Sequence, residues 1–144
     1  MATRGVFDDN FFQGDDYLLG CQFSSTSVAS GTLLATQTCG ASETYLTQSG
    51  ATALTLPSAA AVYAQLILLL TQQSCATPGN LAASVVYKLR IINTNAGTLT
   101  LTAGTGNTLT GTATLATQTW RDFVVTVTSP TTITYQSVGT GTNS

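Results

Sequence analysis

The feature that most constrains the fold of this chain is an alternation of apolar and polar residues between Val85 and Val138. Apolar side chains recur at every second position, and threonine fills most of the positions between them. A β-strand sends successive side chains to opposite faces, so a period of two indicates strands with one buried face. The apolar positions form five groups, over residues 85–91, 99–101, 109–115, 123–127 and 133–135. We therefore expect five short strands in this part of the chain.

Turn residues separate these groups at 93–97, 104–107, 116–119 and 129–130. Glycine and asparagine, which tolerate a positive φ, are frequent there. Short strands at this spacing are typical of a sandwich or a barrel. We predict a mainly β fold, one domain over residues 21–144 built as a sandwich or a barrel, with one short α-helix and an extended N-terminal arm over residues 1–20.

The helix is expected at Ala59–Gln73, because alanine and leucine are strong helix formers and Ser58 is well placed as its N-cap. Its apolar residues lie all round, which predicts burial on most sides. Either a second subunit covers its outer side or the helix closes one end of a single domain. The candidate subunit-interface residues on it are Val62, Leu66 and Leu69. Two or three short strands are expected between Gln22 and Gln48, and another ends at Pro57.

Charged residues make up only 7% of the chain, against about 25% in an ordinary soluble domain. So few charges would do little to keep copies apart, which favours permanent assembly, although a threonine-rich monomer is the alternative. The net charge of −2 argues against nucleic-acid binding, which needs a basic surface. The apolar run at residues 59–70 is too short to cross a membrane, and the first residues do not resemble a signal peptide. We expect synthesis in the cytoplasm.

Catalytic and metal chemistry find little support in the sequence. The chain has no histidine, so neither a Ser/His/Asp nor a Cys/His arrangement can form. Cys21, Cys39 and Cys75 are an odd set without a CxxC pair, which argues against zinc and favours free thiols. A Cys21–Cys39 disulfide stays open. We expect no enzyme activity, no cofactor and no metal.

Residues 1–20 differ from the rest because acidic and aromatic side chains are interleaved there. Such a segment can act as a docking arm, with aromatic rings filling pockets on a partner and carboxylates meeting its basic residues. A flexible terminus is the alternative. The candidate docking residues are Phe7, Asp8, Asp9, Phe11, Phe12, Asp15, Asp16 and Tyr17.

A second group of candidates lies on two of the expected strands. Lys88 and Arg90 share one face of their strand, and Arg121 and Asp122 follow Trp120 on another. They could set the register between subunits, with Asp122 of a neighbour opposing Lys88 and Arg90. Alternatively they form an ion pair within the chain, with arginine stacked on Trp120.

Five motifs occur in the chain from residue 49 onward: SGATALTLP, RIIN, the run TLTAGTG-x-TLTGT, RDFVVT and the terminal QSVGTGT. On this combination, residues 49–142 resemble small virion proteins of tailed phages. These proteins are capsid decoration, cement or head-fibre components. The resemblance implies an antiparallel β-sandwich or jelly-roll-like fold for the domain, and a homotrimer bound to the major capsid protein on the outer capsid surface. The resemblance brings no catalytic residues. A receptor-binding or adhesion module that recognises host glycans is the alternative.

Overall fold

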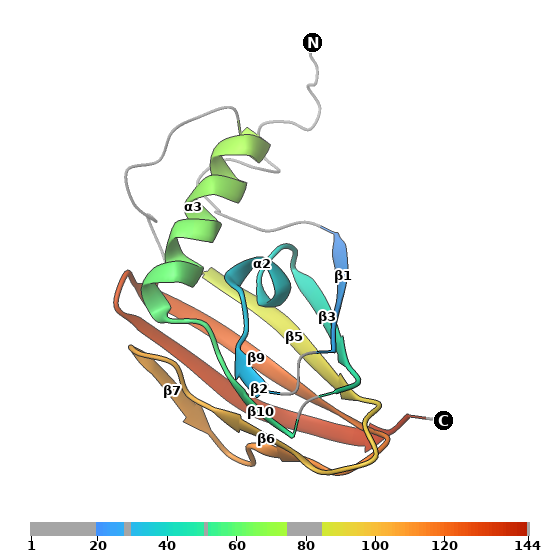
Figure 1. Cartoon of the computed structure of the whole chain (residues 1–144). Coiled ribbons are helices and arrows are strands. Elements are labelled where there is room, and N and C mark those ends of the chain that lie inside the picture. Colours follow the sequence, from blue (N-terminus) through green and yellow to red (C-terminus); the bar gives the residue numbers. More distant parts are fainter. Residues whose placement is uncertain (1–19, 28–29, 51, 75–84, 144) are drawn as a thin grey trace.

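The computed structural model describes residues 20–27, 30–50, 52–74 and 85–143, which form a mainly β fold with two sheets (Figure 1). The strands are β1 (Cys21–Thr26), β2 (Ser30–Thr32), β3 (Glu43–Gln48), β4 (Ala53–Thr55), β5 (Val85–Asn93), β6 (Leu99–Thr102), β7 (Asn107–Thr110), β8 (Thr114–Leu115), β9 (Thr119–Ser129) and β10 (Thr132–Thr142). The helices are α2 (Ala35–Thr38) and α3 (Ala59–Ser74). The large sheet has the order β1-β3-β5-β9-β10-β7, and the small sheet has the order β2-β4-β6-β8.

The chain changes sheet after each of its first six strands. β1, β3 and β5 lie side by side in the large sheet, while β2, β4 and β6 lie side by side in the small one. We call one strand of the large sheet together with the following strand of the small sheet a coil of the chain. Neighbouring strands in a sheet therefore belong to successive coils and run parallel. Cys21 lies opposite Glu43 and Ser30 lies opposite Ala53, so each new coil stacks on the previous one in both sheets.

The expectation of purely antiparallel sheets is wrong. β5 with β9, β9 with β10 and β6 with β8 are antiparallel, but the remaining pairs, including β7 with β10, are parallel. The reason is that parallel neighbours need a long crossover, and here the strand in the opposite sheet supplies it. Alternation along one strand is the same for both kinds of pairing, so the sequence pattern could not distinguish them.

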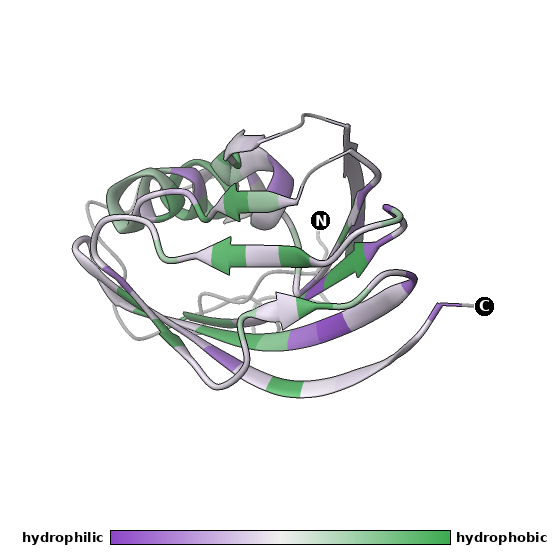
Figure 2. Cartoon of the chain, turned by 60° about the horizontal axis from the view of Figure 1, so that its bottom comes forward, coloured by the Kyte–Doolittle hydropathy of each residue, from purple (hydrophilic) through white to green (hydrophobic). Residues whose placement is uncertain are grey.

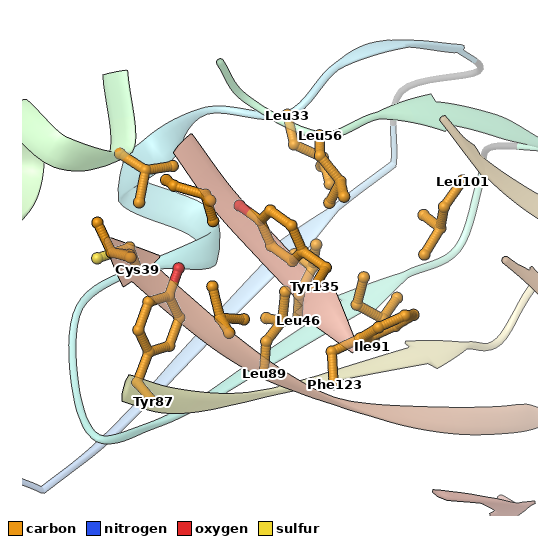
Figure 3. Packing of buried hydrophobic residues seen from close by; sticks show 14 of the residues in the cluster. Leu33, Cys39, Leu46, Leu56, Tyr87, Leu89, Ile91, Leu101, Phe123 and Tyr135 are labelled. Carbon is orange, nitrogen blue, oxygen red and sulfur yellow. The ribbon is translucent and has the colours of Figure 1, made fainter. Parts of the chain in front are cut away.

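The hydrophobic core lies between the two sheets (Figures 2 and 3). β5 buries every second residue, as the sequence pattern predicted, and so do β3 and the middle of β9. Their inward side chains meet Leu54 and Leu101 of the small sheet, and Phe123 and Tyr135 are almost wholly buried between the layers. The expected turns are also confirmed, except that the group at residues 109–115 is divided into β7 and β8. Gly111 takes φ +88° at that point, which L-residues rarely adopt.

Helix α3 lies at one end of the sheets (Figure 1). It begins as predicted, with the Ser58 hydroxyl accepting from the Ala61 amide at 3.2 Å. Val62 and Leu66 are fully buried in the core of a single chain, and Leu69 packs against it partly buried. The opposite stripe, at Ala60, Ala61, Ala64 and Leu68, is exposed, so the helix is buried on one side rather than on most sides.

A buried polar corner holds the coils together where β3 and β5 end. Gln48 lies opposite Asn93 and donates to its side-chain oxygen at 2.7 Å, with both residues fully buried. The Asn93 amide donates to the carbonyls of Gly97 and Leu115 at 2.9 and 3.1 Å. Since Leu115 belongs to β8, this single side chain ties the large sheet to the small sheet.

Helix α2 occupies part of the region where only strands were expected. It spans four residues, and Leu34 is its N-cap. The inward residues of β1 hold it, since the side chains of Gln22 and Ser24 donate to the carbonyls of Thr36 and Gln37. A single helical turn carries no periodic signal long enough to detect.

Candidate functional site

The outer face of the large sheet carries a row of stacked side chains from four strands. Phe23 of β1 lies opposite Tyr45 of β3, which lies opposite Arg90 of β5. The rings of Phe23 and Tyr45 stack, with centroids 5.0 Å apart and planes 15° from parallel. The Arg90 guanidinium lies 5.8 Å from the Tyr45 ring centroid and 3.8 Å from that of Trp120 on β9. We call Phe23, Tyr45, Arg90 and Trp120 the aromatic–arginine row.

The row forms because the inward residues of each strand are committed to the core. Tyr87, Leu89 and Ile91 are buried, so Lys88 and Arg90 must face outward. The same alternation turns Trp120 and Asp122 outward on β9. In-register pairing, parallel from β1 to β5 and antiparallel between β5 and β9, then brings side chains from residues far apart in sequence to neighbouring strands, about 4.8 Å apart.

Asp122 holds Arg90 in place with two hydrogen bonds. Arg90 Nε donates to Oδ1 at 2.7 Å and Nη2 donates to Oδ2 at 2.9 Å, while Lys88 Nζ lies 3.7 Å from Oδ2. The hydrogen bonds from Arg90 to Asp122 raise the pKa of the arginine further above its ordinary value. Only 8% of Asp122 is exposed, so the pair is shielded more than an ordinary surface ion pair. The guanidinium is therefore fixed between the two rings.

Tyr45, which lies between Phe23 and Arg90 in the row, is also hydrogen-bonded. The Tyr45 hydroxyl donates to Glu43 Oε1 at 2.8 Å, and this bond is the main cause of a raised pKa for the tyrosine. Phe23, by contrast, is 77% exposed, and the face of its ring away from Tyr45 has no partner among the described residues. Val86, also on this side of β5, is 56% exposed. This surface therefore combines side chains fixed by hydrogen bonds, Tyr45 and Arg90, with exposed apolar side chains, Phe23 and Val86, that a partner could cover.

Gly141 of β10 makes room for the last member of the row. It lies opposite Trp120, and a Cβ at this position would come within 2.5 Å of the indole ring. Gly139, two residues earlier, has open space around it. The terminal segment QSVGTGT therefore contains one glycine on which the indole depends for space and one that is sterically unconstrained.

The candidate residues predicted from sequence are only partly brought together. Lys88, Arg90 and Asp122 form one cluster, and the counter-charge is the chain's own Asp122, as in the intrachain alternative. Arg121 lies on the opposite face and donates to the Thr114 carbonyl of β8 and to the Ser137 hydroxyl, both at 3.1 Å. It links the two sheets and is remote from the cluster. For Val62 and Leu66, complete burial within one chain favours the helix as the closure of a single domain.

Sequence reasoning missed Phe23 and Tyr45 as members of the site. Each stands in an ordinary alternating segment, and only the stacking of coils places them beside Arg90. The arm candidates at residues 7–17 lie outside the described residues. Cys21 and Cys39, for which a disulfide was left open, are both free thiols, exposed and buried respectively.

The charge of the described part of the chain is concentrated on this face. Its charged residues are Glu43, Lys88, Arg90, Arg121 and Asp122, and all except Arg121 belong to the row or flank it. The described residues do not bring three potential metal-ligating side chains together. Neither helix in this part of the chain is long and apolar enough to cross a membrane.

Comparison of the chain with protein-family models, with curated proteins and with solved structures finds no match.

Proposed function

We propose that the chain is a structural virion protein, a decoration or cement protein that binds the outer surface of a tailed-phage head. The observation that carries this proposal is the preorganised aromatic–arginine row, next to exposed Phe23 and Val86. Aromatic residues and arginine are the side chains that dominate binding energy in protein interfaces. A surface that is already rigid loses little conformational entropy on binding.

The low charge of the chain agrees with this proposal, because a protein held among many neighbours needs little electrostatic repulsion. In the proposed mechanism, the arm at residues 1–20 and the row each make a modest contact with the major capsid protein. Several copies held in one assembly would bind with a higher overall avidity than any single contact provides. The two-sheet arrangement is compatible with the proposed sandwich or jelly-roll class.

A homotrimer remains part of the proposal, and the exposed stripe of α3 supports a subunit contact there. Leu68 is 51% exposed on a helix without any charged residue. Leu68→Asp should therefore lower the mass of the assembly in light scattering while the chain stays folded by circular dichroism. Thr71→Asp, a partly buried position on the same helix, is the matched control and should leave the mass unchanged. An unchanged mass for both variants would remove α3 from the interface.

The decisive experiment is co-sedimentation of the purified chain with undecorated capsids. Wild-type protein should saturate at a fixed number of copies per capsid. Deletion of residues 1–20 should abolish sedimentation, and Tyr45→Ala, which interrupts the row, should weaken it at least tenfold. Thr108→Ala, an exposed position on β7 away from the row, is the control and should bind as the wild type does. Unchanged binding after deletion of the arm would show that the arm does not dock.

The second candidate, a receptor-binding module for host glycans, is favoured by one observation. Three aromatic rings, those of Phe23, Tyr45 and Trp120, share a face with hydrogen-bonding side chains. The Phe23 and Tyr45 rings stack on each other and the Arg90 guanidinium lies over the Trp120 ring, so the open face of Phe23 is the part of the row most available to a sugar. The chain contains a single tryptophan, so titration with host-surface polysaccharide should change its fluorescence if glycans bind the row. A response to polysaccharide without capsid binding would favour this function over the first.

A further inference from the structure

Among the described residues, β1 is an edge strand of the large sheet, and the backbone groups that point away from β3 can be identified. The carbonyls of Gly20 and Thr26 accept from Glu43 and Ser49 at 3.3 and 3.1 Å, so the even-numbered carbonyls point toward β3. Because backbone groups alternate along a strand, those of Cys21, Phe23 and Ser25 point away from β3. They form a row of donors and acceptors along the edge.

Within the part of the chain that the structure describes, this edge has none of the features that normally prevent strand pairing. Its sequence, CQFSST, contains neither a charge nor a proline, and its register with β3 is continuous. Soluble proteins usually block such edges with lysine, proline or a bulge. An unblocked edge of six residues is therefore a site for another strand.

The side chains on the outer face restrict what that strand can be. The aromatic–arginine row continues strand by strand from Trp120 to Phe23 and stops at β1, where one ring face is open. A strand that carries an aromatic ring opposite Phe23 would extend the row. β1 itself has such a ring, and its outward side chains are uncharged, so two copies would oppose no like charges.

We propose that β1 pairs with β1 of a second copy, antiparallel, about a two-fold axis that passes beside Phe23. A rotation axis normal to the sheet keeps the outer faces of both copies on the same side, and this requires antiparallel strands. The register places Phe23 opposite the second copy's Phe23, and Cys21 opposite the second copy's Ser25. This register uses the backbone groups of Cys21, Phe23 and Ser25, which point away from β3. The result is one sheet that continues across both copies, closed by two-fold symmetry.

This pairing goes beyond the proposed capsid role and does not depend on it. It uses the edge of the large sheet, whereas the proposed trimer contact uses α3. Pairing of edges would join neighbouring assemblies to each other on a surface, or join two assemblies in solution.

The first test measures the mass of the full chain by light scattering and sedimentation over a range of concentrations. Phe23→Lys places two positive charges opposite each other, and Ser25→Pro removes an N–H that faces the open edge but none that bonds β3. Both variants should halve the mass of the wild-type assembly, with circular dichroism unchanged. Thr110→Lys, on the opposite edge strand β7, is the matched control and should keep the full mass. The proposal is overturned if neither Phe23→Lys nor Ser25→Pro halves the mass of the assembly. It is also overturned if Thr110→Lys halves the mass as they do.

The second test reports the register. In Ser25→Cys, the new thiol should lie opposite the second copy's Cys21, with Cα atoms about 5.5 Å apart, which a disulfide can bridge. Within one chain the two positions are about 13 Å apart along the strand and cannot be bridged. Oxidation should therefore give a covalent dimer that reducing agent reverses, and adding Cys21→Ser should abolish it. A cross-link that survives Cys21→Ser, or no cross-link at all, contradicts this register. A purified chain that stays unpaired while capturing a strand of the capsid protein would show that the edge serves a different occupant.

Discussion

Replacement of Arg90 by methionine tests whether the aromatic–arginine row is held together by the arginine. Methionine keeps much of the aliphatic contact but removes both charge-assisted hydrogen bonds to Asp122 and the stacking on Trp120. With the Arg90 side chain 26% exposed, the paired hydrogen bonds stabilise the fold by about 1.5–2 kcal/mol, at the lower end for charged groups. The cation–π contact adds about 0.5–2 kcal/mol. We expect Arg90→Met to lower the free energy of unfolding by about 2–4 kcal/mol.

A double-mutant cycle that combines Arg90→Met with Asp122→Asn measures the interaction energy between Arg90 and Asp122. The coupling energy should be about 1–2 kcal/mol, above the 0.2–1 kcal/mol of exposed pairs, because Asp122 is nearly buried. Arg121→Met is the matched control. Arg121 is next to Asp122 in sequence but donates to neutral groups on the opposite face, so its coupling to Asp122→Asn should stay below about 0.5 kcal/mol.

Unfolding should be followed in urea, since guanidinium would screen the ion pair. The fluorescence of Trp120, the only tryptophan of the chain, reports the row directly and should shift to longer wavelength when the guanidinium cover is lost. A coupling energy no larger for Arg90 than for Arg121, with unchanged emission, would refute the idea that Arg90 organises this face.

Three further predictions concern the fold that supports the site. Asn93→Leu leaves buried partners in both sheets without their hydrogen bonds and should cost about 2–6 kcal/mol in urea unfolding; a loss under 1 kcal/mol would contradict the corner's role. Burial raises the pKa of the Cys39 thiol to about 12, so above pH 9 the unfolded chain ionises while the folded chain keeps its proton. Stability should then fall by about 1.4 kcal/mol between pH 7 and pH 10, and Cys39→Ala should remove that loss; equal pH profiles would refute it. Gly141→Ala should displace the Trp120 ring and cost about 1–3 kcal/mol, whereas Gly139→Ala should leave the emission unchanged; equal effects would contradict the packing.

Much of the secondary structure was predictable because its signals are local. The inward residues of β5 and β9 follow directly from the period of two, since one buried face selects every second side chain. Helix α3 was predictable from alanine and leucine together with Ser58, which caps it through a bond spanning three residues. The half-exposed position of Leu68 was not predictable, because a helix that is apolar all round does not specify which side the rest of the chain covers.

The pattern of residues is enough to predict short half-buried strands, one substantial helix and a nearly uncharged, threonine-rich exterior. The alternation of successive coils between two sheets, and their parallel direction, depends on tertiary packing, because a strand's side-chain alternation is the same whichever way its neighbour runs. That stacking aligns Phe23, Tyr45 and Arg90 across three strands, whereas Arg121 and Asp122 lie on opposite faces because successive residues of a strand alternate. The candidate site exists only through register, and register is set by the packing of the core rather than by any single segment.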